Sequence, residues 1–188
     1  DLTQVGLRFQ ANYLWSYLRA PKTVRMNLGA GRMPTFPLSV VEWVSLIEFL
    51  MTQRHMKANP FLKKAIGDSS GVRADLVDKG RALFTGEYAC ASCHQWEGKG
   101  GRVGPDLTSI GTRQNRDWLR RYLVDPNLYA AQGQMPALFY RVAKSGAYIS
   151  VRPGRNVKQD LDAIVAFLTL GQPKTQDTYA MAKKKAIG

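Results

Sequence analysis

Apolar residues recur at helical spacing in two segments of the second half of the chain. The segments cover residues 117–124 and, approximately, residues 157–170. Their apolar positions are Trp118, Leu119, Tyr122 and Leu123 in the first and Leu161, Ile164, Val165 and Leu168 in the second. A repeat of three or four residues places these side chains on one face of a helix that packs on a core. The pattern therefore predicts an amphipathic helix over each segment.

Start signals predict two more helices. Ser39-Val40-Val41-Glu42 is a capping box, which opens a helix that runs to about Thr52. A shorter helix is predicted over 79–84, because Asp75 or Asp78 suits the first turn, where the helix dipole is positive. Together these elements predict an all-α fold.

The charge of the chain is strongly positive. Its 27 Lys and Arg residues exceed its 14 Asp and Glu residues, which gives a formal net charge of +13. Such an excess favours an acidic partner, an anionic membrane surface or nucleic acid. The longest apolar stretch, from Val40 to Met51, is too short to span a bilayer and is interrupted by Glu42 and Glu48. We therefore predict no transmembrane segment in this chain.

Both cysteines of the chain fall in one motif, Cys90-Ala91-Ser92-Cys93-His94. Cys-x-x-Cys-His is the attachment signature of c-type haem. Two thiols three residues apart lie on one side of a helical turn, where each forms a thioether with a different vinyl group of one porphyrin. His94 then serves as the proximal ligand of the iron.

Three other roles for these cysteines fit the sequence less well. A redox dithiol leaves His94 without a task and needs a βαβ setting that the flanking residues do not show. A zinc site needs about four ligands, and His55 is the only further His or Cys in the chain. A disulfide across this spacing closes a tight, strained loop. Haem attachment is the role that uses the whole motif.

From about residue 72 to residue 171, the chain resembles the small monohaem class I cytochrome c family. The matching elements are Gly80, Phe84, Cys90-x-x-Cys93-His94, Gly104-Pro105-Asp106-Leu107, Met135-Pro136 and Phe167. The resemblance implies that Gly80 and Phe167 lie where the first and last helices cross. It also implies that the Pro105 carbonyl accepts a hydrogen bond from the proximal imidazole and that Met135 is the distal ligand. Residues 137–156 are longer than the family's minimal plan, and we expect them to cover a haem edge or bind a partner.

The front of the chain repeats part of the second half. At an offset of 105 residues, residues 1–21 match residues 106–126 without gaps, and nine of these positions are identical. Further along, the equivalent pairs are Gly31-Arg32-Met33-Pro34 with Gly133-Gln134-Met135-Pro136, and Phe49-Leu50 with Phe167-Leu168. The front therefore resembles the latter part of another class I cytochrome c domain, without its first helix and its haem-attachment motif.

These observations predict two tandem class I cytochrome c-like domains. The boundaries are 1–53 for the partial domain, 54–74 for a linker, 75–171 for the complete domain and 172–188 for a basic, frayed tail. We expect the natural protein, or a neighbour in an assembly, to supply the missing part. Met33 is then the distal ligand of a second haem c, attached upstream of residue 1. The rival hypothesis is a degenerate domain that has lost its haem.

The predicted function is the transfer of single electrons. A haem with both axial positions filled has no open site for a substrate, and Met opposite His raises its reduction potential. The protein is then a carrier, or a cytochrome subunit of a respiratory or photosynthetic membrane complex, and its redox partners carry acidic docking surfaces. The resemblance implies a periplasmic or equivalent extracytoplasmic location and disfavours nucleic-acid binding. The alternative is a dihaem enzyme of the peroxidase type, in which one iron loses its distal ligand.

Overall fold

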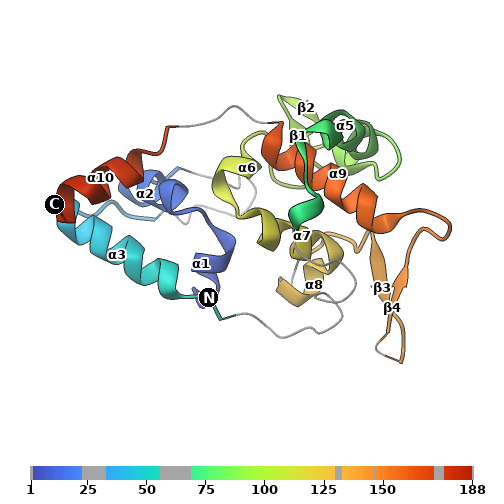
Figure 1. Cartoon of the computed structure of the whole chain (residues 1–188), viewed down its shortest axis with the longest axis horizontal. Coiled ribbons are helices and arrows are strands. Elements are labelled where there is room, and N and C mark those ends of the chain that lie inside the picture. Colours follow the sequence, from blue (N-terminus) through green and yellow to red (C-terminus); the bar gives the residue numbers. More distant parts are fainter. Residues whose placement is uncertain are drawn as a thin grey trace. The chain divides into compact units, whose positions relative to one another are not determined.

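The chain divides into two compact units, which a computed structural model describes over residues 2–22, 33–55, 69–129, 133–145, 147–171 and 176–187. Unit 1 comprises Asp1–Met56, Thr112–Asn115 and Lys174–Gly188. Unit 2 comprises Lys57–Gly111 and Arg116–Pro173. The described part of each unit is mainly helical (Figure 1).

Unit 2 contains most of the described elements. Its helices are α5 (Val77–Thr85), α7 (Arg116–Val124), α8 (Pro126–Tyr129) and α9 (Val157–Leu170), and α6 (Ile110–Arg113) begins in it. Its 3₁₀ turns are η1 (Ser69–Gly71), η2 (Ala74–Leu76) and η3 (Cys90–Ser92). Two antiparallel hairpins pair β1 (Gln95–Trp96) with β2 (Lys99–Gly100) and β3 (Tyr140–Val142) with β4 (Tyr148–Ser150). The fold is therefore helical with short hairpins, which an all-α prediction leaves out.

Helices α5 and α9 cross closely in unit 2 (Figure 1). A Cβ on Gly80 would overlap the Ala163 carbonyl oxygen and lie 2.8 Å from the Phe167 Cβ, so only glycine allows this approach. The Phe167 ring then packs against Phe84 and Trp96, with centroids 5.3 and 4.2 Å away. Burial of each such side chain contributes about 1.5–3 kcal/mol. The crossing predicted at Gly80 and Phe167 is confirmed.

Side-chain caps fix the start of the two longest helices among the described residues. In α9, the Asn156 side chain accepts a hydrogen bond from the Gln159 N–H at 3.1 Å. In α3 (Val40–Thr52), the Ser39 hydroxyl accepts from the Glu42 N–H at 3.3 Å, and the Glu42 carboxylate accepts from the Ser39 N–H at 2.8 Å. Such caps satisfy backbone N–H groups that the helix itself leaves without partners. Both predicted helices are confirmed, including the capping box.

The predicted linker, 54–74, extends too far at its C-terminal end. Val72 is buried in the core of unit 2, between the turns η1 and η2. The Gly- and Ser-rich composition of the preceding residues indicated a loop, but burial of Val72 makes the end of the segment part of the core. Residues 56–68 of the predicted linker lie outside the described residues.

Unit 1 is built from four of the described helices. They are α1 (Val5–Arg8), α2 (Ala11–Arg19), α3 and α10 (Thr178–Ile187). Helix α10 lies beside α2 and α3 (Figure 1). The buried core of the unit consists of Val5, Leu14, Trp15, Leu18, Trp43, Val44, Ile47, Leu50 and Tyr179.

The prediction of a frayed basic tail over 172–188 is wrong for residues 178–187. Tyr179, Ala182 and Ala186 recur at helical spacing and pack against the core of unit 1. The Tyr179 hydroxyl donates a short hydrogen bond to the Glu48 carboxylate, and the Lys183 ammonium lies 2.8 Å from the same group. The lysine run therefore belongs to a packed helix, whereas residues 172–175 and 188 lie outside the described residues.

Candidate functional site

The Cys-x-x-Cys-His motif follows α5 closely in unit 2. The chain enters it through Ala89, whose φ of +48° lies in the left-handed region that non-glycine residues rarely adopt. Cys90–Ser92 then forms η3, and the His94 N–H donates to the Cys90 carbonyl at 2.9 Å. Cys90 packs against the core of unit 2, whereas Cys93 is exposed. A single 3₁₀ turn and the two residues that follow it therefore carry both thiols and the imidazole.

A hydrogen bond fixes the orientation of the imidazole. The Nδ1 atom of His94 lies 2.8 Å from the carbonyl oxygen of Pro105. Because a carbonyl oxygen only accepts, Nδ1 carries the hydrogen, and in the neutral imidazole the lone pair is then on Nε2. The bond also strengthens Nε2 as a metal ligand. This is the contact that the resemblance implies for Pro105.

Glycines pass close to the motif where a side chain would not fit. A Cβ on Gly104 would overlap the His94 ring, and one on Gly101 would overlap the Ser92 carbonyl oxygen. Gly100 has a φ of +106°, a conformation that glycine adopts without strain. The Gly104 N–H donates to the Cys93 carbonyl at 2.7 Å, so the loop folds back over the motif. Sequence reasoning named only Gly104, although the density of glycines after the motif was a usable signal.

The two candidate distal methionines lie in different units. Met135 lies between α8 and β3, is half-buried, and packs against the same core as Cys90. Met33 lies in unit 1, before α3, and is 38% exposed. Cys90, His94 and Met135 thus all belong to unit 2, and Cys90 and Met135 pack against its core. Residues 31 and 32, which precede Met33 in the predicted loop, lie outside the described residues.

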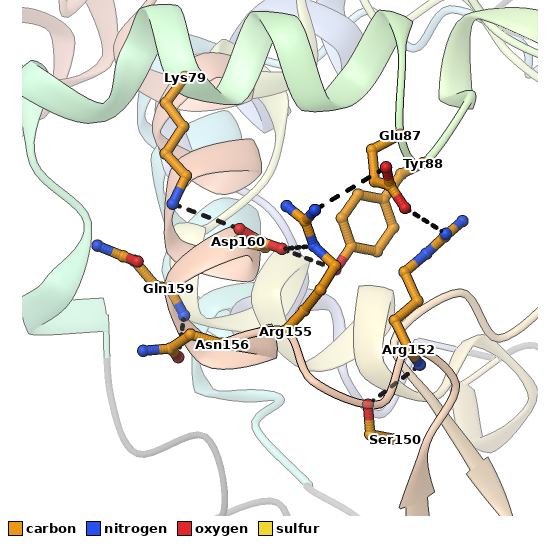
Figure 2. Close-up of polar contacts among 9 residues, drawn as sticks. All are labelled: Lys79, Glu87, Tyr88, Ser150, Arg152, Arg155, Asn156, Gln159 and Asp160. Atoms are coloured by element: carbon orange, nitrogen blue, oxygen red, sulfur yellow. Dashed lines mark hydrogen bonds and ion pairs between the residues drawn. The ribbon is translucent and has the colours of Figure 1, made fainter.

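A network of charged side chains holds the chain just before the motif (Figure 2). Arg152, which follows β4, lies 2.6 Å from the Glu87 carboxylate, and its guanidinium lies 4.8 Å from the centroid of the Tyr88 ring. Asp160 of α9 accepts from the Tyr88 hydroxyl at 3.2 Å and from Arg155 at 2.7 Å. The chain between β4 and α9 is thereby tied to the residues that lead into Cys90. This is part of the long stretch, 137–156, that sequence reasoning left without a structure.

Burial and neighbouring charges shift several pKa values around the motif. Burial raises the pKa of the Cys90 thiol to about 11 and that of the Tyr88 hydroxyl to about 12. Burial alone would raise the pKa of Asp160, but Arg155 and Lys79 outweigh it and hold that pKa below its ordinary value. At neutral pH Asp160 is therefore ionised, whereas Tyr88 and a free Cys90 thiol are protonated.

The donor set suits a covalently attached haem. Cys90 and Cys93 supply two thiols on one turn, and His94 presents an imidazole whose Nε2 lone pair is free for iron. Met135 supplies a thioether sulfur against the same core. Two thiols attach a c-type haem and an imidazole ligates its iron, and a Met thioether is the second iron ligand in cytochromes with Met/His ligation. The Gly104 backbone lies directly against the His94 ring and limits its rotation.

This fold and motif define a class: helical proteins that attach haem through Cys-x-x-Cys-His. A model of the cytochrome c family matches residues 77–170, half of the chain, and the chain therefore belongs to the cytochrome c family. The match supports a class I c-type cytochrome with covalently bound haem c. Cytochromes of this family typically transfer electrons, and such domains are commonly extracytoplasmic. A search of curated proteins and a search of solved structures each gave no match.

No helix among the described residues combines the length and the apolar character needed to cross a membrane.

Proposed function

We propose that this protein transfers single electrons through a haem c that Cys90 and Cys93 attach and that His94 and Met135 ligate. The observation that carries the proposal is the hydrogen bond between His94 Nδ1 and the Pro105 carbonyl, because it leaves Nε2 as an iron ligand. With His94 and Met135 in the two axial positions, no position remains for a substrate. The protein therefore acts as an electron-transfer protein and not as an enzyme.

When bound, the haem iron supplies a one-electron couple. The residues of the chain set its orientation and its surroundings. Pro105 holds the His94 ring, and the apolar core against which Cys90 and Met135 pack excludes water. An apolar surrounding disfavours the extra positive charge of the ferric form, and a Met ligand acts in the same direction. Both effects raise the reduction potential.

The proposed setting is extracytoplasmic, either as a carrier or as a cytochrome subunit of a respiratory or photosynthetic membrane complex. The net charge of +13 supports redox partners with acidic docking surfaces. Such complementarity increases the rate of encounter, and salt screens it.

A second haem c, attached upstream of residue 1 with Met33 as its distal ligand, completes the proposal. The two repeats make the same close backbone approach: a Cβ on Gly6 would overlap the Met51 backbone, and one on Gly111 would meet the Thr169 backbone. Gly6 and Gly111 are equivalent in the repeat, and Met51 and Thr169 each follow a Phe-Leu pair. This similarity supports a shared arrangement, in which Met33 takes the place of Met135. The rival remains a degenerate domain without haem.

Two measurements on the protein isolated from its own cells test these proposals. A low-spin ferric spectrum with slow cyanide binding supports the electron-transfer protein, whereas a high-spin haem or rapid cyanide binding favours the peroxidase-type enzyme. Haem per polypeptide, from pyridine haemochrome absorbance against intact mass, decides the second site. Two haems support Met33 as a ligand, and one haem supports the degenerate domain.

A further inference from the structure

One face of helix α3 in unit 1 is exposed although it carries a large aromatic side chain. Phe49 is 60% exposed, and Ser45 and Glu42, one and two turns before it, are exposed as well. Residues at this spacing lie along the same side of a helix. Helix α10 contacts α3 elsewhere, through Glu48. The face formed by Glu42, Ser45 and Phe49, here called the α3 face, thus stays open in the described chain.

The equivalent face of α9 in unit 2 is fully covered. The Phe-Leu pairs align α3 with α9, so that Glu42, Ser45 and Phe49 correspond to Asp160, Ala163 and Phe167. The backbone approaches of Gly6 to Met51 and of Gly111 to Thr169 agree with the same alignment. In α9 these three residues are buried, with exposed fractions of 3%, 0% and 1%.

Helix α5 provides this cover. Lys79 lies 3.4 Å from the Asp160 carboxylate, and Gly80 lies against the Ala163 carbonyl and the Phe167 Cβ. The Arg81 guanidinium lies 4.9 Å from the centroid of the Phe167 ring. Lys79 thus contacts Asp160, Gly80 contacts Ala163, and Arg81 contacts Phe167. The α3 face repeats the chemistry that this strip of α5 recognises: a carboxylate, a small residue and a phenyl ring.

We propose that the α3 face is the docking surface for a second α5-like helix. This helix has a glycine over Ser45 and a basic residue opposite Glu42, and it comes from polypeptide that precedes residue 1. The order of the repeat assigns this source, because α5 precedes the repeated segment that begins at Asp106. The proposal rests on the second haem site of the proposed function, since the same helix leads into the haem motif in unit 2.

Carbene footprinting of the protein isolated from its own cells tests the cover directly. Val142 on β3 is the matched control, because its exposed fraction of 56% is close to the 60% of Phe49. We expect Phe49 to be labelled several-fold less than Val142, with an intact mass that includes further N-terminal polypeptide. Equal labelling of the two residues overturns the proposal. Protection that vanishes when a second copy or another protein is dissociated also overturns it.

A pair of variants of the same protein gives an independent test. Ser45→Trp puts a bulky side chain where a helix must approach closely, and Val142→Trp puts it on an exposed strand. We expect Ser45→Trp alone to lower the thermal midpoint and to increase labelling of Phe49. Equal midpoints for both variants overturn the proposal. The spectrum of the haem at Cys90 and Cys93 reports the proposed electron transfer separately, and we expect it to stay unchanged in both variants.

Discussion

Arg120 of α7 and Asp162 of α9 form an ion pair that is almost fully buried in unit 2. The Nε and Nη2 atoms of Arg120 lie 2.8 and 2.7 Å from the same carboxylate oxygen. At the positions equivalent by the repeat, unit 1 has Trp15 and Val44, both buried in its core. In unit 1, two apolar residues therefore occupy the positions that the ion pair occupies in unit 2.

The energetics of this pair predict opposite results for single and double substitutions. At an effective dielectric constant of about 20, the attraction across 2.7 Å is about 6 kcal/mol, and desolvation of the two ions costs several kcal/mol each. The net contribution of the intact pair is therefore small. Asp162→Val alone leaves the Arg120 guanidinium buried without its carboxylate, and we expect it to lower the free energy of unfolding by about 3–5 kcal/mol. We expect Arg120→Met combined with Asp162→Val to return it to within about 1 kcal/mol of the parent.

Equilibrium urea unfolding of the haem-loaded protein at neutral pH measures these differences, with circular dichroism and haem absorbance as probes. Arg73 and Asp75 provide the control, because their ion pair, at 2.5 Å, is exposed. We expect Asp75→Val to change the unfolding midpoint little, since exposed pairs contribute little. A double variant as unstable as Asp162→Val alone would refute the reasoning, because it would show that the pair itself stabilises the unit.

Two further substitutions test the site and its network. Gly104→Ala should displace the His94 ring, because the added Cβ overlaps it, and visible absorbance should show loss of the low-spin spectrum. Asp160→Asn should destabilise the protein most near neutral pH. The low pKa of Asp160 means that its carboxylate stabilises the fold above the unfolded-state pKa of about 4, and that this contribution is lost as the pH falls through the lower folded-state value. Urea unfolding of parent and variant across this range measures the difference.

Controls separate these effects from general damage. At Gly154 an added Cβ meets no atom within 4 Å, so Gly154→Ala should keep the haem spectrum even though its φ of +84° makes the change mildly strained. An unchanged spectrum in Gly104→Ala would contradict the proposed packing against His94. For Asp160→Asn, a destabilisation that grows as the pH falls below about 4 would contradict the assigned direction of the pKa shift.

Local signals in the sequence predicted two helices and the haem motif. The capping box at Ser39 and the apolar stripe of residues 157–170 each specify a helix through nearby residues alone, and both helices form where predicted. The haem motif is equally local. Gly80 was named through the family resemblance, and the structure gives the reason, because a Cβ there would overlap the Ala163 carbonyl oxygen.

The features that sequence reasoning missed depend on residues far apart in the chain. Helix α10 presents one tyrosine and two alanines to its core, a faint pattern beside a run of lysines. Arg120 looks like part of the polar face of its helix, and only the approach of Asp162 in α9 explains its burial. The hairpin of β3 and β4 has Ser145-Gly146 in its sequence, a turn signal that sequence reasoning did not use. Its C-terminal flank is held by Arg152 and Arg155, whose partners Glu87 and Asp160 the sequence does not identify.

A potentiometric titration of the haem-loaded protein, compared with Met135→Ala, tests the central claim most directly. The control is Met181→Ala, because Met181 is 61% exposed on α10. For the haem at Cys90 and Cys93 we predict a one-electron wave of about 59 mV per decade in the parent and the control. For Met135→Ala we predict a lower potential and a high-spin ferric spectrum, since the iron loses its distal ligand. Identical potentials and spectra for the parent and Met135→Ala would contradict the ligation by His94 and Met135.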